Sequence, residues 1–314
     1  MRLVISAACF AAALAVVAPA WAQTAPPTPP AQVTPRIAIP SPAPIAPSGL
    51  RWQRYPRASE IQLQSVVGFV RVRPEDREDV AIAIVNPGPL QAPEIRRVGR
   101  RLVIDGRENG RLRSCTVQGV AGLEVDLMRA GRVSGAQLPI IEIRVPERAV
   151  ISATGAIRMH ITTAEAAQIS FDACGDVDIE RVQDEAEVSV SHRARLRIYD
   201  VGMLEATVAG QGQVVAGYVR DGLTVSIAGP GTFSAARANG PTNFVIQGPG
   251  EAVVRGGEAE EMTVVINGPG RVEHQGSAES LDAFIVGGGE VRVRDVDGDV
   301  TQRVIAGGDV IVGP

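Results

Sequence analysis

The chain has 314 residues, with 31 basic and 35 acidic side chains and a formal net charge of −4. The lack of a basic surplus argues against a dedicated nucleic-acid binder, and three cysteines are too few for a disulfide scaffold or a multi-cysteine metal site. Hydrophobic residues make up 45% of the chain but aromatic residues only 4%, so aliphatic side chains must fill most of the core.

Residues 1–22 have the features of a secretory signal peptide. Arg2 gives a short positive start, an apolar run follows to about Ala18, and Ala20 and Ala22 supply a small-x-small cleavage pattern. The run of about 16 apolar residues is shorter than the roughly 20 that a membrane-spanning helix needs. We therefore predict an exported protein, periplasmic or at the cell surface, with no transmembrane segment in the mature chain.

Residues 23–50 form a proline-rich linker with almost no charge. Proline fixes φ and removes a backbone donor, so this segment is expected to be extended and disordered, without a core of its own. It serves as a spacer in the simpler interpretation. The alternative is a docking site for a partner with a groove that binds polyproline-type helices.

Short strands follow in residues 51–146. Apolar residues alternate with polar ones around Ile61 and Leu63, and again around Val70 and Val72, while turn residues such as Pro74 separate the segments. A further strand at residues 140–146 ends in proline. No segment has a helical apolar period over twelve residues, so helix is expected to be minor.

Glycine recurs at a nearly constant interval through the second half of the chain. The last glycine of each glycine corner serves as an anchor, and the stretches of chain between successive anchors are almost equal in length. The anchors are Gly212, Gly231, Gly250, Gly270, Gly289 and Gly308. Weaker copies are predicted to have their anchors at Gly155 and Gly175. A period of this kind is the sequence signature of a repeat architecture.

Side chains recur in the same register. Four residues before the six anchors stand only β-branched aliphatic residues, in order Val208, Ile227, Ile246, Ile266, Ile285 and Val304. Apolar and polar positions alternate around them, which is typical of a strand with one buried face. A unit of about 19 residues cannot enclose a core, but stacked units bury a continuous aliphatic column.

The sequence therefore predicts an all-β fold, a single-stranded β-solenoid that resembles a parallel β-helix, with coils of about 19 residues. Blades of a β-propeller need about 40 residues or more, so this period excludes them. The solenoid is expected to cover residues 51–314, with an irregular strand-rich part at 51–146 and regular coils at 147–314. At the corners, glycine is expected to supply an unusual backbone conformation.

No residue pattern predicts catalysis or a cofactor. His160, His192 and His274 fall in different columns of different coils, so we expect them on the surface or at corners rather than in a shared metal site or triad. The carboxylates between Asp295 and Asp299 lack the glycine and glutamate spacing of a calcium loop, and a solvated turn is favoured there.

Carboxylates also alternate along residues 176–180. Asp176 and Asp178 point outward, and Arg195 and Arg197 occupy matching positions one coil later. This is the ordinary cross-strand charge pairing of a solvated sheet. The alternative is a polysaccharide-cleaving β-helix, which would need an acid and a base or nucleophile on one face.

Two cysteines, Cys115 and Cys174, remain after the predicted cleavage. In an oxidising compartment such a pair commonly forms a disulfide, and we predict this bridge.

The order of the segments resembles a known family. Glu60-Ile61-Gln62-Leu63 is followed by Val70-Arg71-Val72-Arg73 and by a strand from Val80 to Ile84, and Ile143-Arg144-Val145-Pro146 then leads into the glycine-anchored coils. This order, over residues 55–314, is similar to the head GIN domain family, whose name associates it with auto-transporter adhesins of bacterial envelopes. The resemblance implies a secreted β-solenoid with a role in adhesion, and no catalytic residues.

The favoured function is a non-catalytic, exported binding module of the cell envelope. Its ligand, a protein or a glycan of the envelope or surface, is unknown. The alternatives are the polysaccharide-acting enzyme and a scaffold that self-associates through its terminal coils. Nucleic acid is not an expected partner.

Overall fold

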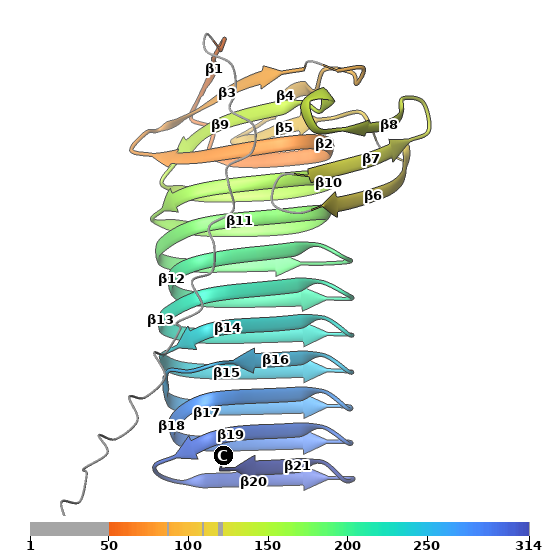
Figure 1. Ribbon diagram of the computed structural model, residues 1–314. Helices are drawn as coiled ribbons and strands as arrows, with labels where there is room; N and C mark the ends of the chain where they lie inside the picture. The colour runs from red at the N-terminus through yellow and green to blue at the C-terminus, as the bar shows by residue number, and fades with distance from the viewer. Residues whose placement is uncertain (1–49, 87, 109, 119–121, 314) are drawn as a thin grey trace, which may run out of the picture. The chain divides into compact units, whose positions relative to one another are not determined.

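A computed structural model describes residues 50–86, 88–108, 110–118 and 122–313 of the chain. The predicted signal peptide and all but the last residue of the predicted linker lie outside these ranges. The described residues wind into a β-solenoid of about 9 turns, which confirms the predicted fold class (Figure 1). Among them, no helix has the length and hydropathy of a membrane span.

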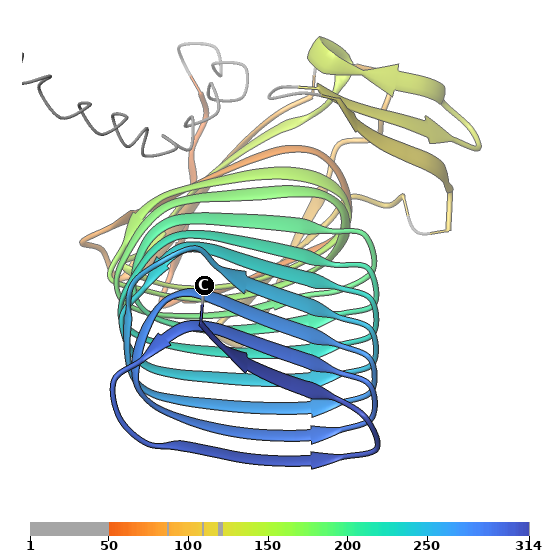
Figure 2. The same ribbon diagram turned by 60° about the horizontal axis from the view of Figure 1, so that its bottom comes forward.

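Most coils run along one flat face, turn at a glycine corner and return along a second face (Figure 2). The strands are β10 (Arg148–Ala164), β11 (Ala166–Val190), β12 (Arg195–Ala209), β13 (Gln213–Ala228), β14 (Thr232–Ala238), β15 (Gly240–Gln247), β16 (Glu251–Val254), β17 (Glu258–Asn267), β18 (Arg271–Val286), β19 (Glu290–Val296), β20 (Val300–Ile305) and β21 (Asp309–Val312). Each pairs in parallel with its equivalents in the neighbouring coils.

The first coils are less regular. Strand β2 (Glu60–Glu75) pairs in parallel with β10 on one side and with β5 (Arg101–Asp105) and β9 (Ile140–Pro146) on the other. Three strands add antiparallel pairs at this end: β1 (Gln53–Pro56), β3 (Asp79–Val85) and β4 (Glu94–Val98). Strands predicted around Ile61 and Val70 and at residues 140–146 are therefore present.

A second sheet, which the sequence analysis did not predict, interrupts the first coils. It consists of β6 (Leu112–Gln118), β7 (Gly122–Leu127) and β8 (Gly131–Ser134), paired antiparallel, and a 3₁₀ turn η1 (Gly135–Gln137) follows. Figure 1 shows it beside the first coils. Leu123 and Val125 of this sheet share an apolar cluster with Phe69 and Ala156 of the solenoid, so the insertion buries outward-facing residues of the early coils.

The predicted aliphatic column is present in the core. Ile227 pairs with Ile246, Ile246 with Ile266, and Ile266 with Ile285. Their exposed fractions are 0–1%. Each is therefore stacked on its equivalent in the next coil, as the constant glycine interval predicted.

The anchor glycines leave room for this column. A Cβ atom at Gly250 would lie 2.5 Å from Cγ2 of Ile227, and one at Gly270 would lie 2.5 Å from Cγ2 of Ile246. Real Cβ contacts are not this short. A side chain at Gly250 or Gly270 would therefore displace the isoleucine of the preceding coil.

The unusual backbone conformation belongs to the first glycine of each corner rather than to the anchor. Gly229 has a φ of 96° and Gly248 a φ of 98°, in a region that glycine enters readily. The prediction did not distinguish the glycines within a corner. In the structure, the first glycine has the unusual φ, and the anchor glycine is the one with no room for a Cβ atom.

The register predicted for the first anchors was wrong. Gly175 pairs with Ile157, and Gly155 pairs with Ala173, whereas the sequence analysis aligned Gly155 with Gly175. The reason is that the step from β10 to its partners in β11 is shorter than the stretch of chain between the two glycines. Gly155 has a φ of 125°, and a Cβ there would lie 2.0 Å from the carbonyl oxygen of Val66, so it remains a structural glycine in another position.

The prediction that His274 lies on the surface or at a corner was also wrong. Its side chain lies inside the solenoid with an exposed fraction of 0%, between Val254 and Val293 of the adjacent coils. Nε2 lies 3.1 Å from the carbonyl oxygen of Ser277. Burial lowers the pKa of His274 below 6.5, and the hydrogen bond to Ser277 opposes this shift only in part.

We predict that His274 makes the fold sensitive to mild acid. The unfolded chain binds the proton first as the pH falls through about 6.5, so the free energy of unfolding falls below that pH and is unaffected above it. The loss is at most about 1.4 kcal/mol per pH unit. Urea unfolding at pH 7.5 and at pH 5.5 measures this change. Between the two pH values, the free energy of unfolding should fall more in the native chain than in His274→Val. Equal losses in the two proteins would contradict this assignment.

Candidate functional site

One flat face of the solenoid carries a column of hydroxyl groups, and we call it the hydroxyl face. Its residues are Ser152, Ser170, Ser189, Thr207 and Ser226, one from each of five consecutive coils. The backbone register pairs Ser152 with Ser170, Ser189 with Thr207, and Thr207 with Ser226. Adjacent strands of a sheet are about 4.8 Å apart, so the hydroxyls form a regular row along the solenoid.

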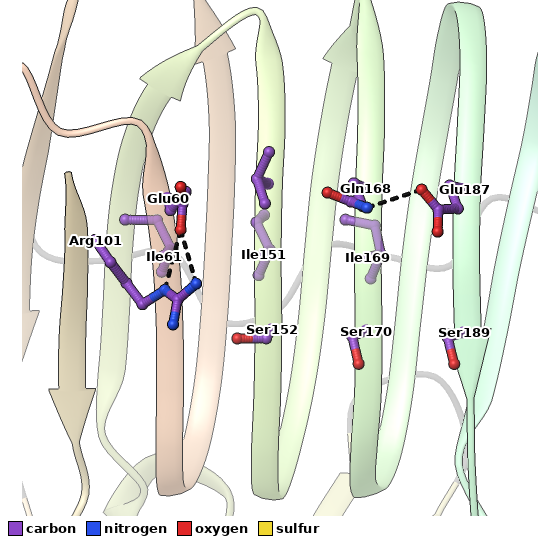
Figure 3. A pocket seen from close by; sticks show the side chains of 11 residues that line it. Glu60, Ile61, Arg101, Ile151, Ser152, Gln168, Ile169, Ser170, Glu187 and Ser189 are labelled. Carbon is purple, nitrogen blue, oxygen red and sulfur yellow. Dashed lines mark hydrogen bonds and ion pairs between the residues drawn. The ribbon is translucent and has the colours of Figure 1, made fainter.

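A hollow of 330 Å³ lies at the start of this row (Figure 3). Ser152, Ser170 and Ser189 lie side by side along one part of it. Two polar pairs border another part: Gln168 Nε2 donates to Glu187 Oε2 at 2.8 Å, and Arg101 Nε donates to Glu60 Oε2 at 3.0 Å.

The same column becomes apolar in later coils. Ser226 pairs with Val245, Val245 with Val265, and Val265 with Phe284. Val245 is 36% exposed. The face therefore offers hydroxyls over its first part and aliphatic and aromatic surface over its second.

This arrangement suits an extended ligand rather than a small one. The hydroxyls both donate and accept, and the column carries no charged side chain from Ser152 to Phe284, after which Arg303 follows in the last coil. A polymer with repeated hydroxyl groups and apolar ring faces could contact both parts of the column at once.

The opposite flat face, which we call the charged face, carries Arg158, Asp176, Asp178, Arg195 and Arg197. The predicted pairing is correct, because Asp176 lies opposite Arg195 and Asp178 opposite Arg197. The prediction of a solvated sheet is wrong for the carboxylates, however. Asp176 is 5% exposed and Asp178 3%.

Ion pairs compensate these buried charges. Arg197 Nε donates to Asp178 Oδ1 at 2.5 Å, and its Nη2 donates to Asp176 Oδ2 at 3.0 Å. Burial alone would lower the pKa of Arg197, but the hydrogen bond and charge of Asp178 outweigh it, so the pKa is raised. Burial, assisted by the charge of Asp178, raises the pKa of the neighbouring Tyr199 to about 12.

The charged face does not suit acid–base cleavage of a polysaccharide. Such cleavage needs two carboxyl groups that both reach the scissile bond of the substrate. Asp176 and Asp178 both contact Arg197, and Glu180 Oε1 lies 3.1 Å from His160 Nε2. The contacts of these carboxylates are those of a structural ion-pair network.

The other candidate residues are dispersed. His160 lies on the charged face, His192 is exposed at a corner, and His274 is in the core. Asp295, Asp297 and Asp299 are exposed where β19 leads into β20. Within the described part of the chain, no three histidine, cysteine or acidic residues are grouped so that they could hold a metal ion.

Cys115 and Cys174 form a disulfide in the structure, with their Cα atoms 6.3 Å apart. Cys115 belongs to β6 and Cys174 to β11. The bridge therefore attaches the second sheet to the solenoid.

The hydroxyl face was not predicted, although the sequence contains a signal for it. Ser170 and Ser189 are separated by the same interval as the anchors Gly212 and Gly231, and so are Thr207 and Ser226. Alignment of the inward columns treated the outward positions as variable. The same alignment applied to outward positions would have identified this column.

Residues 218–314 match the model of the family described as "Putative auto-transporter adhesin, head GIN domain". The resemblance to this family is therefore confirmed. No curated protein is significantly similar to the chain in sequence.

Two solved structures share the fold. A putative adhesin from Parabacteroides distasonis ATCC 8503 is 18% identical, with a TM-score of 0.51 over 84% of this chain and 96% of the other. A putative adhesin from Parabacteroides merdae ATCC 43184 is also 18% identical, with a TM-score of 0.51 over 85% of this chain and 97% of the other.

Proposed function

We propose that this protein is a non-catalytic binding module. The premise is the match of residues 218–314 to the head GIN domain. The protein is exported and acts in the cell envelope or at the cell surface. Its ligand is a neutral polysaccharide, which lies along the hydroxyl face.

The single observation that carries this proposal is the uncharged hydroxyl column across successive coils. A row of short hydroxyls spaced by the strand interval can exchange hydrogen bonds with the repeated hydroxyls of a sugar polymer. The exposed Val245 and its neighbours then accept the apolar faces of sugar rings. Glu60, Glu187 and Glu205 lie in the adjacent column, which disfavours an anionic polymer.

The test uses immobilised polysaccharides and two matched double variants. Thr207→Arg/Ser226→Arg places two long charged side chains on the hydroxyl face. Thr232→Arg/Ser234→Arg makes the same changes on the charged face, where both residues belong to β14 and are half-buried. Biolayer interferometry against amylose, dextran, laminarin and the anionic alginate measures binding.

We expect the native protein to bind at least one neutral polysaccharide more tightly than alginate. The hydroxyl-face variant should weaken this binding at least about tenfold, which is about 1.4 kcal/mol, and the charged-face variant should leave it unchanged. Equal weakening by both variants, or binding to alginate alone, would rule out the hydroxyl face as the site.

Self-association through a terminal coil is a second proposal, favoured by the exposure of the last coil. Val304 continues the buried column of Ile285, yet it is 38% exposed. Antiparallel strands complete the first coils at the other end. The exposed coil can pair with the same coil of a second copy, and such a self-complementary contact gives a closed two-fold dimer.

We expect sedimentation equilibrium to give twice the chain mass for the native protein and the single mass for Val304→Lys. Thr301→Lys, which points outward on the same strand, is the matched control and should remain dimeric. A native protein that is monomeric at high concentration would disprove the dimer.

A further inference from the structure

A second hollow, which we call the corner hollow, lies between β6 and the corners of successive coils. Its volume is 750 Å³, within the range of sites for small ligands. Leu112 and the Cys115–Cys174 disulfide line it from the side of the second sheet, while His192 and Arg193 line it from a corner of the solenoid. It shares no residue with the hollow on the hydroxyl face.

Part of the lining is apolar. Leu112 and the Cys115–Cys174 disulfide are the apolar side chains of the wall, and the disulfide holds β6 against β11. This wall can bury the apolar body of a ligand.

Positive charge surrounds the apolar wall. Arg113 and Arg193 are both exposed, and neither forms an ion pair with a carboxylate among the described residues. Arg193 Nε donates to Gln211 Oε1 at 3.0 Å, which leaves its two terminal nitrogens for another acceptor. Guanidinium groups bind carboxylates and similar anions through paired hydrogen bonds.

The acidic residue of the hollow is already engaged. Asp172 Oδ1 lies 2.6 Å from His192 Nδ1 and accepts a hydrogen bond from Ser191 Oγ at 2.7 Å. It therefore holds the histidine in place instead of pairing with either arginine. The local charge complements an anion.

His192 is the second independent sign of a site. Its φ is 59°, whereas the equivalent positions in the next two coils are Gly210 and Gly229, with φ of 64° and 96°. This region of φ is unfavourable for a residue with a side chain. Residues held in such conformations cluster at ligand sites, and here the strained residue lines the hollow.

We propose that the corner hollow binds a small amphipathic anion, an aliphatic or aromatic carboxylate. Its charged group contacts Arg113 and Arg193, and its apolar body lies against Leu112 and the disulfide. This site goes beyond the proposed binding of polysaccharide and is independent of it.

Isothermal titration calorimetry of the full-length, disulfide-bonded protein tests the site, with octanoate as the probe. Octanol and octylammonium have the same apolar chain and should not bind measurably. Arg113→Gln and Arg193→Gln should each raise the Kd of octanoate about fivefold, as the loss of one exposed ion pair predicts. Arg255→Gln, an exposed arginine distant from the hollow in sequence and absent from its lining, is the matched control and should leave the Kd unchanged.

His192→Gly separates a functional role from a structural one. Because glycine adopts this backbone conformation without strain, the melting temperature should be unchanged or higher, while octanoate binds more weakly. The proposal is overturned if octanol binds as tightly as octanoate. It is also overturned if Arg113→Gln and Arg193→Gln bind octanoate like Arg255→Gln.

Discussion

Ile246→Asp should prevent the solenoid from folding. Ile246 has an exposed fraction of 0% and is stacked between Ile227 and Ile266. A carboxylate in this column would have no partner, and the cost of burying an unpaired charge exceeds about 5 kcal/mol. Because the column is continuous, the defect lies in the middle of the stack rather than at an end. Far-ultraviolet circular dichroism should show loss of the β signal, and urea unfolding should show no cooperative transition.

Val245→Asp is the matched control, since the adjacent residue points outward and is 36% exposed. A carboxylate there remains in water, and the free energy of unfolding should change by about 0.5 kcal/mol or less. Comparable destabilisation by the two substitutions would show that Ile246 is not in a buried column.

Removal of the disulfide should have the second largest effect, and it should be local. Cys115→Ala/Cys174→Ala opens a loop with a sequence separation of 59 residues, which costs on the order of 4 kcal/mol in the chain-entropy model. In the folded protein the second sheet should open most readily without the bridge, because it otherwise contacts the solenoid through a small apolar cluster. Native-state hydrogen exchange should show faster exchange of the β7 amides in the variant.

The amides of β15 provide the internal control within the same protein. They belong to coils that pair with each other along the whole solenoid, so their protection should be unchanged. Unchanged exchange in β7, or equal acceleration in β7 and β15, would contradict a local role for the bridge.

The regular coils could be predicted from sequence because, in a stacked repeat, the spacing between glycines in the sequence determines which residues of adjacent coils pair. Once Gly231 and Gly250 are aligned, every residue between them has a fixed partner one coil away. The pairs Ile227–Ile246 and Phe233–Ala252 follow from this alignment alone, and the structure contains both. The number of residues per coil is nearly constant from Gly212 onward, so an error in register does not grow from one coil to the next.

The prediction failed where the number of residues per coil changes and where side chains of neighbouring coils cover an outward position. The shorter step between β10 and β11 moved Gly155 out of the predicted register. Asp178 points outward by alternation, yet it is 3% exposed. The alternation along a strand gives the direction of a side chain but does not show whether neighbouring side chains cover it. His274 was assigned to the surface or a corner because the three histidines fall in different columns, although its alternation with Val272 placed it inside.

The candidate sites were harder to predict for a related reason. The hydroxyl face depends on outward positions, and the corner hollow depends on β6, which belongs to an inserted sheet without the repeat. Only the position of Cys115 and the disulfide hypothesis linked that sheet to the solenoid in advance. Arg113 lines the corner hollow because β6 lies beside the corners of the solenoid, and the repeat interval does not reveal this placement.

Cross-linking between adjacent coils tests the stacking most directly. Thr224 and Asn243 are paired across neighbouring coils, at a strand spacing of about 4.8 Å, which a disulfide can bridge. Thr224→Cys/Asn243→Cys should form a bridge under mild oxidation, while Thr224→Cys/Thr263→Cys, two coils apart, should not. Equal bridging of both pairs, or bridging of the second pair alone, would contradict the stacked coils.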